Sequence, residues 1–335
     1  QAMKRTTLKT LIAAAAVALT AGSAFAQTKL KWAHVYETSE PYHTESVWAA
    51  EEIKKRTNGR FEIQVFPASS LGKETDINQG MTLGTVDMII SGPSFAARSY
   101  PRIGVAYYPF IFRDADHLIA YSKSPVFKEM IDGYRAKTGI QILAYTYYGA
   151  RHTTSQKPFT DCAGMKGLKI RVPDVPAYRA TPEACGANPT PIAFAEVYLA
   201  LQNGTVEAQE NPLTTIEAKK FYEVQKYVSG TNHVYATNPV QISKRFWDRL
   251  SPTEQKILQE AATEAQNWQR TVSREVSSKA LGELTAKGMI YNDLPAAELA
   301  AMRAAVRPVY DKFAAAYDPA IVTLFRAELE RVSKL

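Results

Sequence analysis

The sequence predicts an α/β protein with two doubly wound domains and a ligand cleft between them. One reason is that short apolar, strand-like segments alternate along the chain with segments whose apolar residues recur at helical spacing. A second reason is that this alternation occurs twice, once before and once after about residue 150. A third is length, because a chain of 335 residues can bury two cores.

The first half of the chain is expected to contribute three strands and two helices. Residues 30–35 and 61–66 have strand composition, and residues 86–90 are mostly apolar, as strands buried on both faces are. Residues 46–57 and 74–84 have helical spacing, and a glycine stands at or just after the end of each, which favours helix termination. Strands that alternate with helices in this way predict a doubly wound sheet.

The second half repeats this order. Strands are expected at residues 139–145, 167–172, 188–192 and 206–212, and helices at residues 175–186 and 194–204. In the second of these strands three apolar residues alternate with Lys169 and Arg171, which is the period-two pattern of a half-buried strand. Because Pro173 ends the strand, Arg171 stands near its carboxyl end.

A long helix is expected after residue 251. Residues 251–254, Ser-Pro-Thr-Glu, form a capping box with proline at the first helical position. Apolar residues then recur every three or four positions as far as Val276. No low-complexity linker or short-period repeat interrupts the chain.

Residues 3–26 have the features of a secretion signal, and we expect Gln1 and Ala2, which stand before Met3, to be a cloning remnant. Three basic residues come before the apolar run 11–19, which is too short to span a bilayer and is expected to be helical. Residues 24–26, Ala-Phe-Ala, have the small-x-small form of a cleavage site. We therefore expect cleavage after Ala26 and export to the periplasm.

The net charge argues against a nucleic-acid surface. The formal charge is +7, but the signal segment holds three of the 40 basic residues and none of the 33 acidic ones, so the mature balance is about +4. Basic and acidic residues are interspersed rather than clustered. No nucleic-acid partner is expected.

The two cysteines, Cys162 and Cys185, both lie in the part that would be exported to an oxidising compartment. We expect them to form a disulfide, which would close a loop around the strand at 167–172. The alternative is a pair of buried thiols.

The sequence contains no familiar catalytic or cofactor motif. Dinucleotide and phosphate-binding glycine loops, a nucleophile elbow, zinc-protease histidine spacing and a CxxC pair are all absent from it. We therefore expect a binding protein with no cofactor and no metal, and not an enzyme. The alternative class is a secreted lyase or hydrolase acting on an acidic sugar, with Glu74 and His34 as its acid and base.

Four motifs carry a resemblance to a known family. They are Gly-Ala-Arg at residues 149–151, Gly-Met-Lys-Gly-Leu-Lys-Ile-Arg-Val-Pro at 164–173, the segment 189–202, and Gln-Glu-Asn-Pro at 209–212. With them the chain resembles the periplasmic solute-binding proteins of TRAP transporters, over essentially the whole mature length.

The resemblance implies a fold and a function. It implies two α/β domains joined by crossing strands and by a long helix that spans both, with domain I at residues 27–148 and 237–276 and domain II at residues 149–236 and 277–335. The domains would close over a small organic acid and deliver it to a membrane permease driven by an ion gradient. A monomer is expected.

The resemblance also assigns site residues in domain II. Arg171 matches an arginine that pairs with the ligand carboxylate, and a guanidinium offers the planar fork that this pairing needs. Arg151 matches a second arginine of the cleft, and Asn211 matches a position that hydrogen-bonds the carboxylate or its neighbour. Phe194 matches an aromatic wall of the pocket. Each could instead be surface or core, and Asn211 could be a helix cap.

His34, Glu74 and Asn238 are further candidates, at positions that vary with the ligand in the family. The sialic-acid binders of the family carry an acidic residue just after the third strand, where residues 91–94 here are Ser-Gly-Pro-Ser. This difference argues against sialic acid and favours a hydroxylated monocarboxylate such as a uronate or aldonate. A dicarboxylate or keto acid is the alternative, with Arg98 or Arg151 as a second cation.

Overall fold

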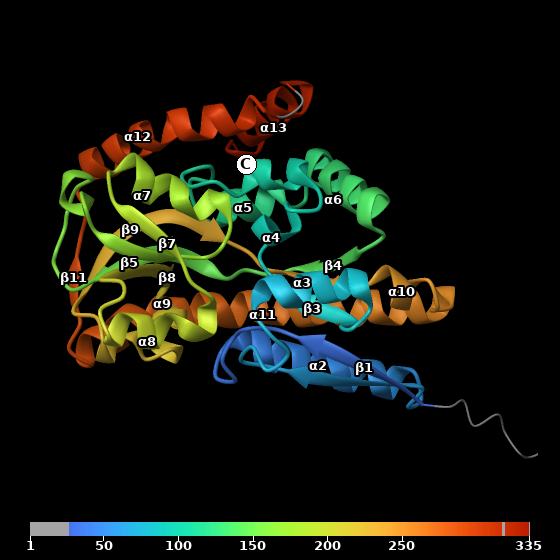
Figure 1. The fold of residues 1–335 in the computed structure, drawn as a ribbon. Coiled ribbons are helices and arrows are strands. Elements are labelled where there is room, and N and C mark those ends of the chain that lie inside the picture. Colours follow the sequence, from blue (N-terminus) through green and yellow to red (C-terminus); the bar gives the residue numbers. More distant parts are fainter. Residues whose placement is uncertain (1–26, 317–318, 335) are drawn as a thin grey trace, which may run out of the picture.

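The computed structural model describes residues 27–316 and 319–334 and contains two mixed β-sheets with helices packed around them (Figure 1). The first sheet has the spatial order β2 (Phe61–Phe66), β1 (Thr28–Ala33), β3 (Met88–Ile90), β10 (Pro239–Ile242), β4 (Gln141–Tyr145). The second has the order β11 (Ile290–Asn292), β9 (Tyr227–Ala236), β5 (Gly149–Ser155), β8 (Ala208–Pro212), β6 (Lys169–Val172), β7 (Asn188–Pro191). The expected α/β class is confirmed, whereas the predicted signal segment and cleavage site lie outside the described residues.

Helices connect the strands. The α-helices are α2 (Pro41–Arg56), α3 (Glu74–Leu83), α4 (Pro93–Ala96), α5 (Ala115–Tyr121), α6 (Pro125–Thr138), α7 (Ala180–Ala184), α8 (Val197–Gln202), α9 (Leu213–Ala218), α10 (Lys244–Trp247), α11 (Pro252–Ala286), α12 (Ala296–Ala314) and α13 (Pro319–Val332). Short 3-10 helices are η1 (Pro101–Ala106), η2 (Ala163–Met165), η3 (Pro176–Arg179), η4 (Phe194–Glu196) and η5 (Phe221–Glu223). The helices expected at 175–186 and 194–204 therefore each begin as a 3-10 turn.

The first sheet is parallel where helices connect its strands. β1 pairs in parallel with β2 and with β3, because α2 and α3 return the chain to the same end of the sheet. β10 enters from the second domain and runs antiparallel to β3 and β4. The paired residues Trp32 and Met88 on one face and Ala33 and Ile89 on the other are all buried, so this sheet is covered on both faces.

The second sheet has a polar centre. β5 runs antiparallel to β8 and β9, and β6 runs parallel to β7 and β8. Thr154 donates to Gln225 Oε1 at 2.9 Å and accepts from Gln209 Nε2 at 2.9 Å, so these buried polar groups satisfy one another. The sequence pattern did not predict β5 or β9.

Two crossings and one helix join the sheets. The chain passes from β4 to β5 and returns from β9 to β10, while the 35-residue α11 extends across both domains (Figure 1). The predicted capping box is present, since Ser251 Oγ accepts from Glu254 N at 3.3 Å and Glu254 Oε2 accepts from Ser251 N at 2.8 Å. Gln269 of α11 bonds both the N–H and the carbonyl of Tyr147, at 3.2 and 2.8 Å. The spanning helix thus holds the backbone of one crossing segment.

The C-terminal helices divide between the domains. α12 packs against α7, but α13 packs against α5, α6 and η1, which all belong to the range predicted as domain I. The ring of Phe325 meets the ring of Tyr121 edge to face at 5.3 Å. The predicted domain II range, 277–335, therefore ends with a helix that packs on the other domain, because the apolar face of α13 is covered there.

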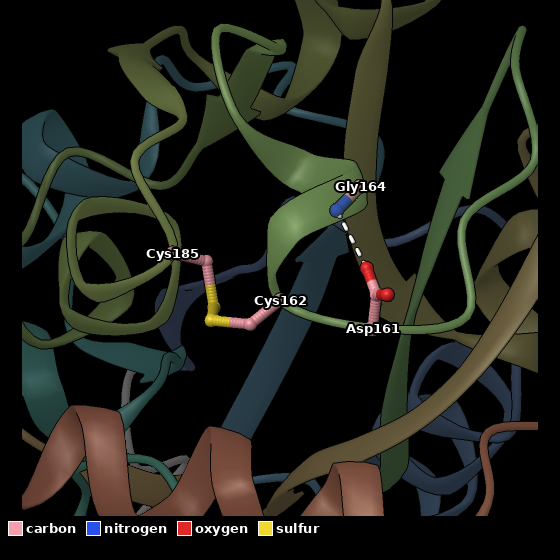
Figure 2. Close-up of a disulfide and its surroundings, with 4 residues drawn as sticks. All are labelled: Asp161, Cys162, Gly164 and Cys185. Atoms are coloured by element: carbon pink, nitrogen blue, oxygen red, sulfur yellow. Dashed lines mark hydrogen bonds between the residues drawn. A yellow bond between two sulfur atoms is a disulfide. The ribbon is translucent and has the colours of Figure 1, made fainter.

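The expected disulfide joins Cys162 to Cys185 (Figure 2). It links the start of η2 to the end of α7, and β6 lies in the loop that it closes. On the η2 side Asp161 Oδ1 accepts from Gly164 N at 2.7 Å and fixes the turn. The crosslink therefore constrains the strand that carries Arg171.

Candidate ligand-binding site

A small cavity lies between the domains, where strands of both sheets end. Six of the seven predicted ligand residues line it, and they are Glu74, Arg151, Arg171, Phe194, Asn211 and Asn238. Its volume is about 30 Å³, and it adjoins an outer pocket of about 300 Å³ that shares Glu74, Arg171 and Phe194 with it. The position agrees with the rule that α/β sheets bind ligands beyond the carboxyl ends of their strands.

Arg171 has no carboxylate at hydrogen-bonding distance among the described residues. Its side chain is only 3% exposed, and its Nε donates to the Ile192 carbonyl at 2.9 Å. Neither terminal nitrogen has a hydrogen-bond partner among the described residues. Burial, together with the nearby Arg151 charge, lowers the pKa of Arg171 to about 10. The free edge of this guanidinium is therefore the group most able to receive an anion.

Arg151 is matched inside the protein. Its Nε donates to Glu210 Oε2 at 2.5 Å, and its Nη2 donates to Glu210 Oε1 and to the Glu210 carbonyl, both at 2.7 Å. Burial alone would raise the pKa of Glu210, but the Arg151 charge and the bonds from Arg151 and His233 lower it to about 2. The guanidinium also lies 4.8 Å from the centre of the Tyr178 ring. Arg151 is thus a poorer cation for a ligand than its place in the motif suggested.

Three polar side chains offer further ligand contacts. Glu74 Oε1 accepts from Ser91 Oγ at 2.8 Å and from Gly92 N at 2.9 Å, while its other oxygen has no partner among the described residues. Burial raises the pKa of Glu74. The Asn238 Nδ2 is buried without a described partner, and Asn211 Nδ2 donates to Gln209 Oε1 at 2.7 Å. These groups can hydrogen-bond hydroxyls and carbonyls of a ligand.

Aromatic rings form the walls. The Tyr36 ring lies 5.2 Å from Tyr148 and 6.2 Å from Phe194, measured between ring centres. Phe194 lines the cavity, and its ring centre lies 5.9 Å from the Arg171 guanidinium. Tyr36, Tyr148 and Tyr178 line the cavity but were not predicted. The run of tyrosines at the β4–β5 crossing was the signal that could have indicated Tyr148.

His34 does not line the cavity. Its Nδ1 accepts from Tyr36 N at 3.2 Å, and its Nε2 lies 3.3 Å from His43 Nδ1. Burial and the neighbouring His43 lower the pKa of His34 to about 3, so the ring is neutral. His34 therefore bonds the backbone of the turn after β1, through Tyr36 N, and is not one of the cavity-lining residues.

Two ion pairs bridge the domains at the mouth of the outer pocket. Lys73 Nζ lies 3.3 Å from Glu196 Oε1, and Arg98 Nη2 lies 3.0 Å from Asp174 Oδ2. Both pairs are exposed, so each contributes little to stability. Arg98, the other predicted candidate for a second ligand cation, is thus engaged at the rim.

Two α/β domains that meet at a polar, partly charged cavity define a two-domain solute-binding protein. The family model described as bacterial extracellular solute-binding protein, family 7 (DctP) matches residues 32–316. The chain belongs to this family, whose members are binding proteins of TRAP transporters and not enzymes. No helix within residues 27–316 and 319–334 has the length and apolar character needed to cross a membrane.

Several relatives are similar over most of their length. A solute-binding protein of Roseobacter denitrificans is 37% identical over 87% of this chain and 90% of its own length. Its crystal structure, with bound L-galactonate, has a TM-score of 0.82 and covers 90% of this chain and 98% of that one, at 34% identity. The 2,3-diketo-L-gulonate-binding periplasmic protein YiaO of Escherichia coli is 34% identical over 80% of this chain and 81% of its own length. A Polaromonas structure bound to D-erythronate has a TM-score of 0.84 at 31% identity, covering 90% of this chain and 99% of that one.

Proposed function

We propose that this protein captures a hydroxylated monocarboxylate, an aldonate or a related sugar acid, in the periplasm and delivers it to a TRAP permease. The ligand carboxylate pairs with the free edge of Arg171. Its hydroxyls are bound by Glu74, Asn238 and Asn211, and its carbon chain lies against Phe194. No chemical step is part of this function.

The observation that carries the proposal is that one of the two cavity arginines has a carboxylate partner and the other has none among the described residues. Glu210 neutralises Arg151 through two side-chain bonds, whereas Arg171 has no carboxylate partner among the described residues. One free cation suits one carboxylate, and a second carboxylate would be buried without a partner, which is costly. This favours a monocarboxylate over the dicarboxylate alternative.

The ligands of related proteins support the same class. L-galactonate and D-erythronate each carry one carboxylate and several hydroxyls, and both are bound in structures with TM-scores above 0.8 to this chain. The cavity of about 30 Å³ holds roughly one or two water molecules in this conformation. Binding of a four- to six-carbon acid therefore requires the domains to separate and close again around it.

A ligand panel tests the proposal. The mature protein would be heated with L-galactonate, D-erythronate, D-galacturonate, succinate and pyruvate, and hits would be confirmed by calorimetry. A ligand at a hundredfold excess over its Kd stabilises by about 2.7 kcal/mol, so true ligands give a clear shift. The proposal fails if succinate binds and the hydroxylated acids do not. Recovery of altered ligand after incubation would instead support the enzyme alternative.

A further inference from the structure

The buried acid Glu210 has no role in the carboxylate contact described above, yet it holds the second cation of the cavity. We propose that Glu210 is the specificity-determining residue that sets the ligand charge. By occupying Arg151 it leaves a single free guanidinium, so the protein selects monoanions over dianions of the same carbon skeleton. This inference rests on the proposed function.

Several contacts fix the position of the Glu210 side chain. Glu210 lies in β8, opposite Thr153 of β5, and is 2% exposed. His233 Nε2 lies 2.9 Å from Glu210 Oε2, and His233 Nδ1 lies 2.8 Å from Thr231 Oγ1. Because His233 and Arg151 both bond the same carboxylate, Glu210 has little freedom to turn away when a ligand enters.

Few charged groups set the net charge that a ligand meets in the cavity, so loss of one of them changes it. The guanidinium groups of Arg171 and Arg151 and the carboxyl group of Glu74 belong to residues that line the cavity, whereas the Glu210 carboxylate is bonded to Arg151 and is not part of the lining. Glu74 lies close enough to both arginines for their charges to act on it, although burial opposes its ionisation. Removing the Glu210 charge leaves Arg151 unmatched in a buried site, where a second ligand carboxylate can replace the lost partner.

A purely structural ion pair would behave differently. Loss of such a pair destabilises the fold but weakens the binding of mono- and dianions alike. Arg151 lines the ligand cavity and lies 4.8 Å from the Tyr178 ring, which is also a cavity residue. The ratio of two affinities, rather than either affinity alone, therefore separates the two roles.

The test is Glu210→Gln, which keeps the size of the side chain and one acceptor oxygen, replaces the other oxygen by an amide N–H donor, and removes the charge. Calorimetry at constant ionic strength would compare L-galactonate with galactarate, and D-erythronate with meso-tartrate. Each pair differs only at the terminal carbon. We expect the dianion-to-monoanion affinity ratio to rise at least about tenfold, from the attraction of one added unit charge. Glu210→Asp should keep the wild-type ratio, as should the exposed control Glu129→Gln.

Further variants keep the inference falsifiable if Glu210→Gln does not fold. In Arg151→Gln, the unmatched Glu210 charge should lower the ratio, and in Arg151→Gln/Glu210→Gln the ratio should return to the wild-type value. If the wild type binds the monoacids but every folded variant has the same affinity ratio, the proposed role of Glu210 is refuted and the proposed function is not. A wild type that binds none of the four acids would instead refute the proposed function and this inference with it.

Discussion

Replacement of Arg171 by alanine removes the only cavity guanidinium that lacks a carboxylate partner among the described residues. In the free protein the change deletes one hydrogen bond, from Nε to the Ile192 carbonyl at 2.9 Å. It also removes a buried charge whose pKa burial lowers to about 10, which is a cost to the unliganded fold. We therefore expect the variant to fold, with a free energy of unfolding close to that of the wild type.

The loss of affinity should be large. Without Arg171, the ligand carboxylate enters a closed cavity with no free cation, because Glu210 holds Arg151 through bonds of 2.5 and 2.7 Å. Truncation of one partner of a buried, hydrogen-bonded charge pair costs about 2–5 kcal/mol. This corresponds to a Kd raised by roughly 30-fold to several thousandfold.

Isothermal calorimetry with the best ligand of the panel measures this effect, and urea unfolding of the free protein checks the fold. Arg171→Lys is the matched variant that keeps the charge. It should recover only part of the affinity, because an ammonium cannot form the two parallel bonds of a guanidinium. Arg98→Ala is the control, because it removes an arginine from the rim of the outer pocket. It should change Kd by only a few-fold.

An Arg171→Ala protein that binds the ligand with wild-type affinity would refute the reasoning. The carboxylate would then have to pair elsewhere, and Arg151 would be the remaining cavity cation. Full recovery by Arg171→Lys would also contradict the argument in part, because charge alone and not the planar fork would then account for the affinity.

Three further predictions concern stability and closure. Cys162→Ser/Cys185→Ser should lower the free energy of unfolding by about 3 kcal/mol in a urea titration, because it opens a loop of some twenty residues; an unchanged value would contradict this. Burial raises the pKa of Glu40 to about 7, so the contribution of its protonated form to stability is present below pH 4.5 and is lost as the pH rises through 7. Glu40→Gln should therefore remove about 3 kcal/mol of the pH dependence of the free energy of unfolding. Plots of that free energy against pH that run parallel for wild type and variant would contradict this. Asp174→Asn breaks the exposed pair with Arg98 and should weaken ligand binding about two- to fivefold at low salt, with the difference vanishing at high salt.

Local pattern in the sequence determined the class of fold and the place of most strands. The second predicted strand, residues 61–66, coincides with β2, and the capping box at 251–254 opens α11 at the expected residue. These features depend on side-chain periodicity and on backbone groups only a few residues apart, which a sequence displays directly. The strand ending near Arg171 likewise placed that residue at the cleft.

Strands without an apolar pattern required the tertiary structure. β5 reads Gly-Ala-Arg-His-Thr-Thr-Ser, and its buried hydroxyls are satisfied by partners such as Gln225, 71 residues away from Thr154. No local rule reveals a strand whose polar groups are matched at such distances. The same holds for α13, whose apolar face could have packed on either domain.

The charge of the candidate site was also decided only by the tertiary structure. The family resemblance placed Arg151 and Arg171 together in a cleft and gave the ligand carboxylate to Arg171, but it did not reveal that Arg151 has a carboxylate partner inside the protein. Glu210, 59 residues from Arg151 in the chain, is brought to 2.5 Å from it by the antiparallel pairing of β5 and β8. Electrostatic matching depends on distance in space and on burial, and neither is encoded in the spacing of residues along the chain.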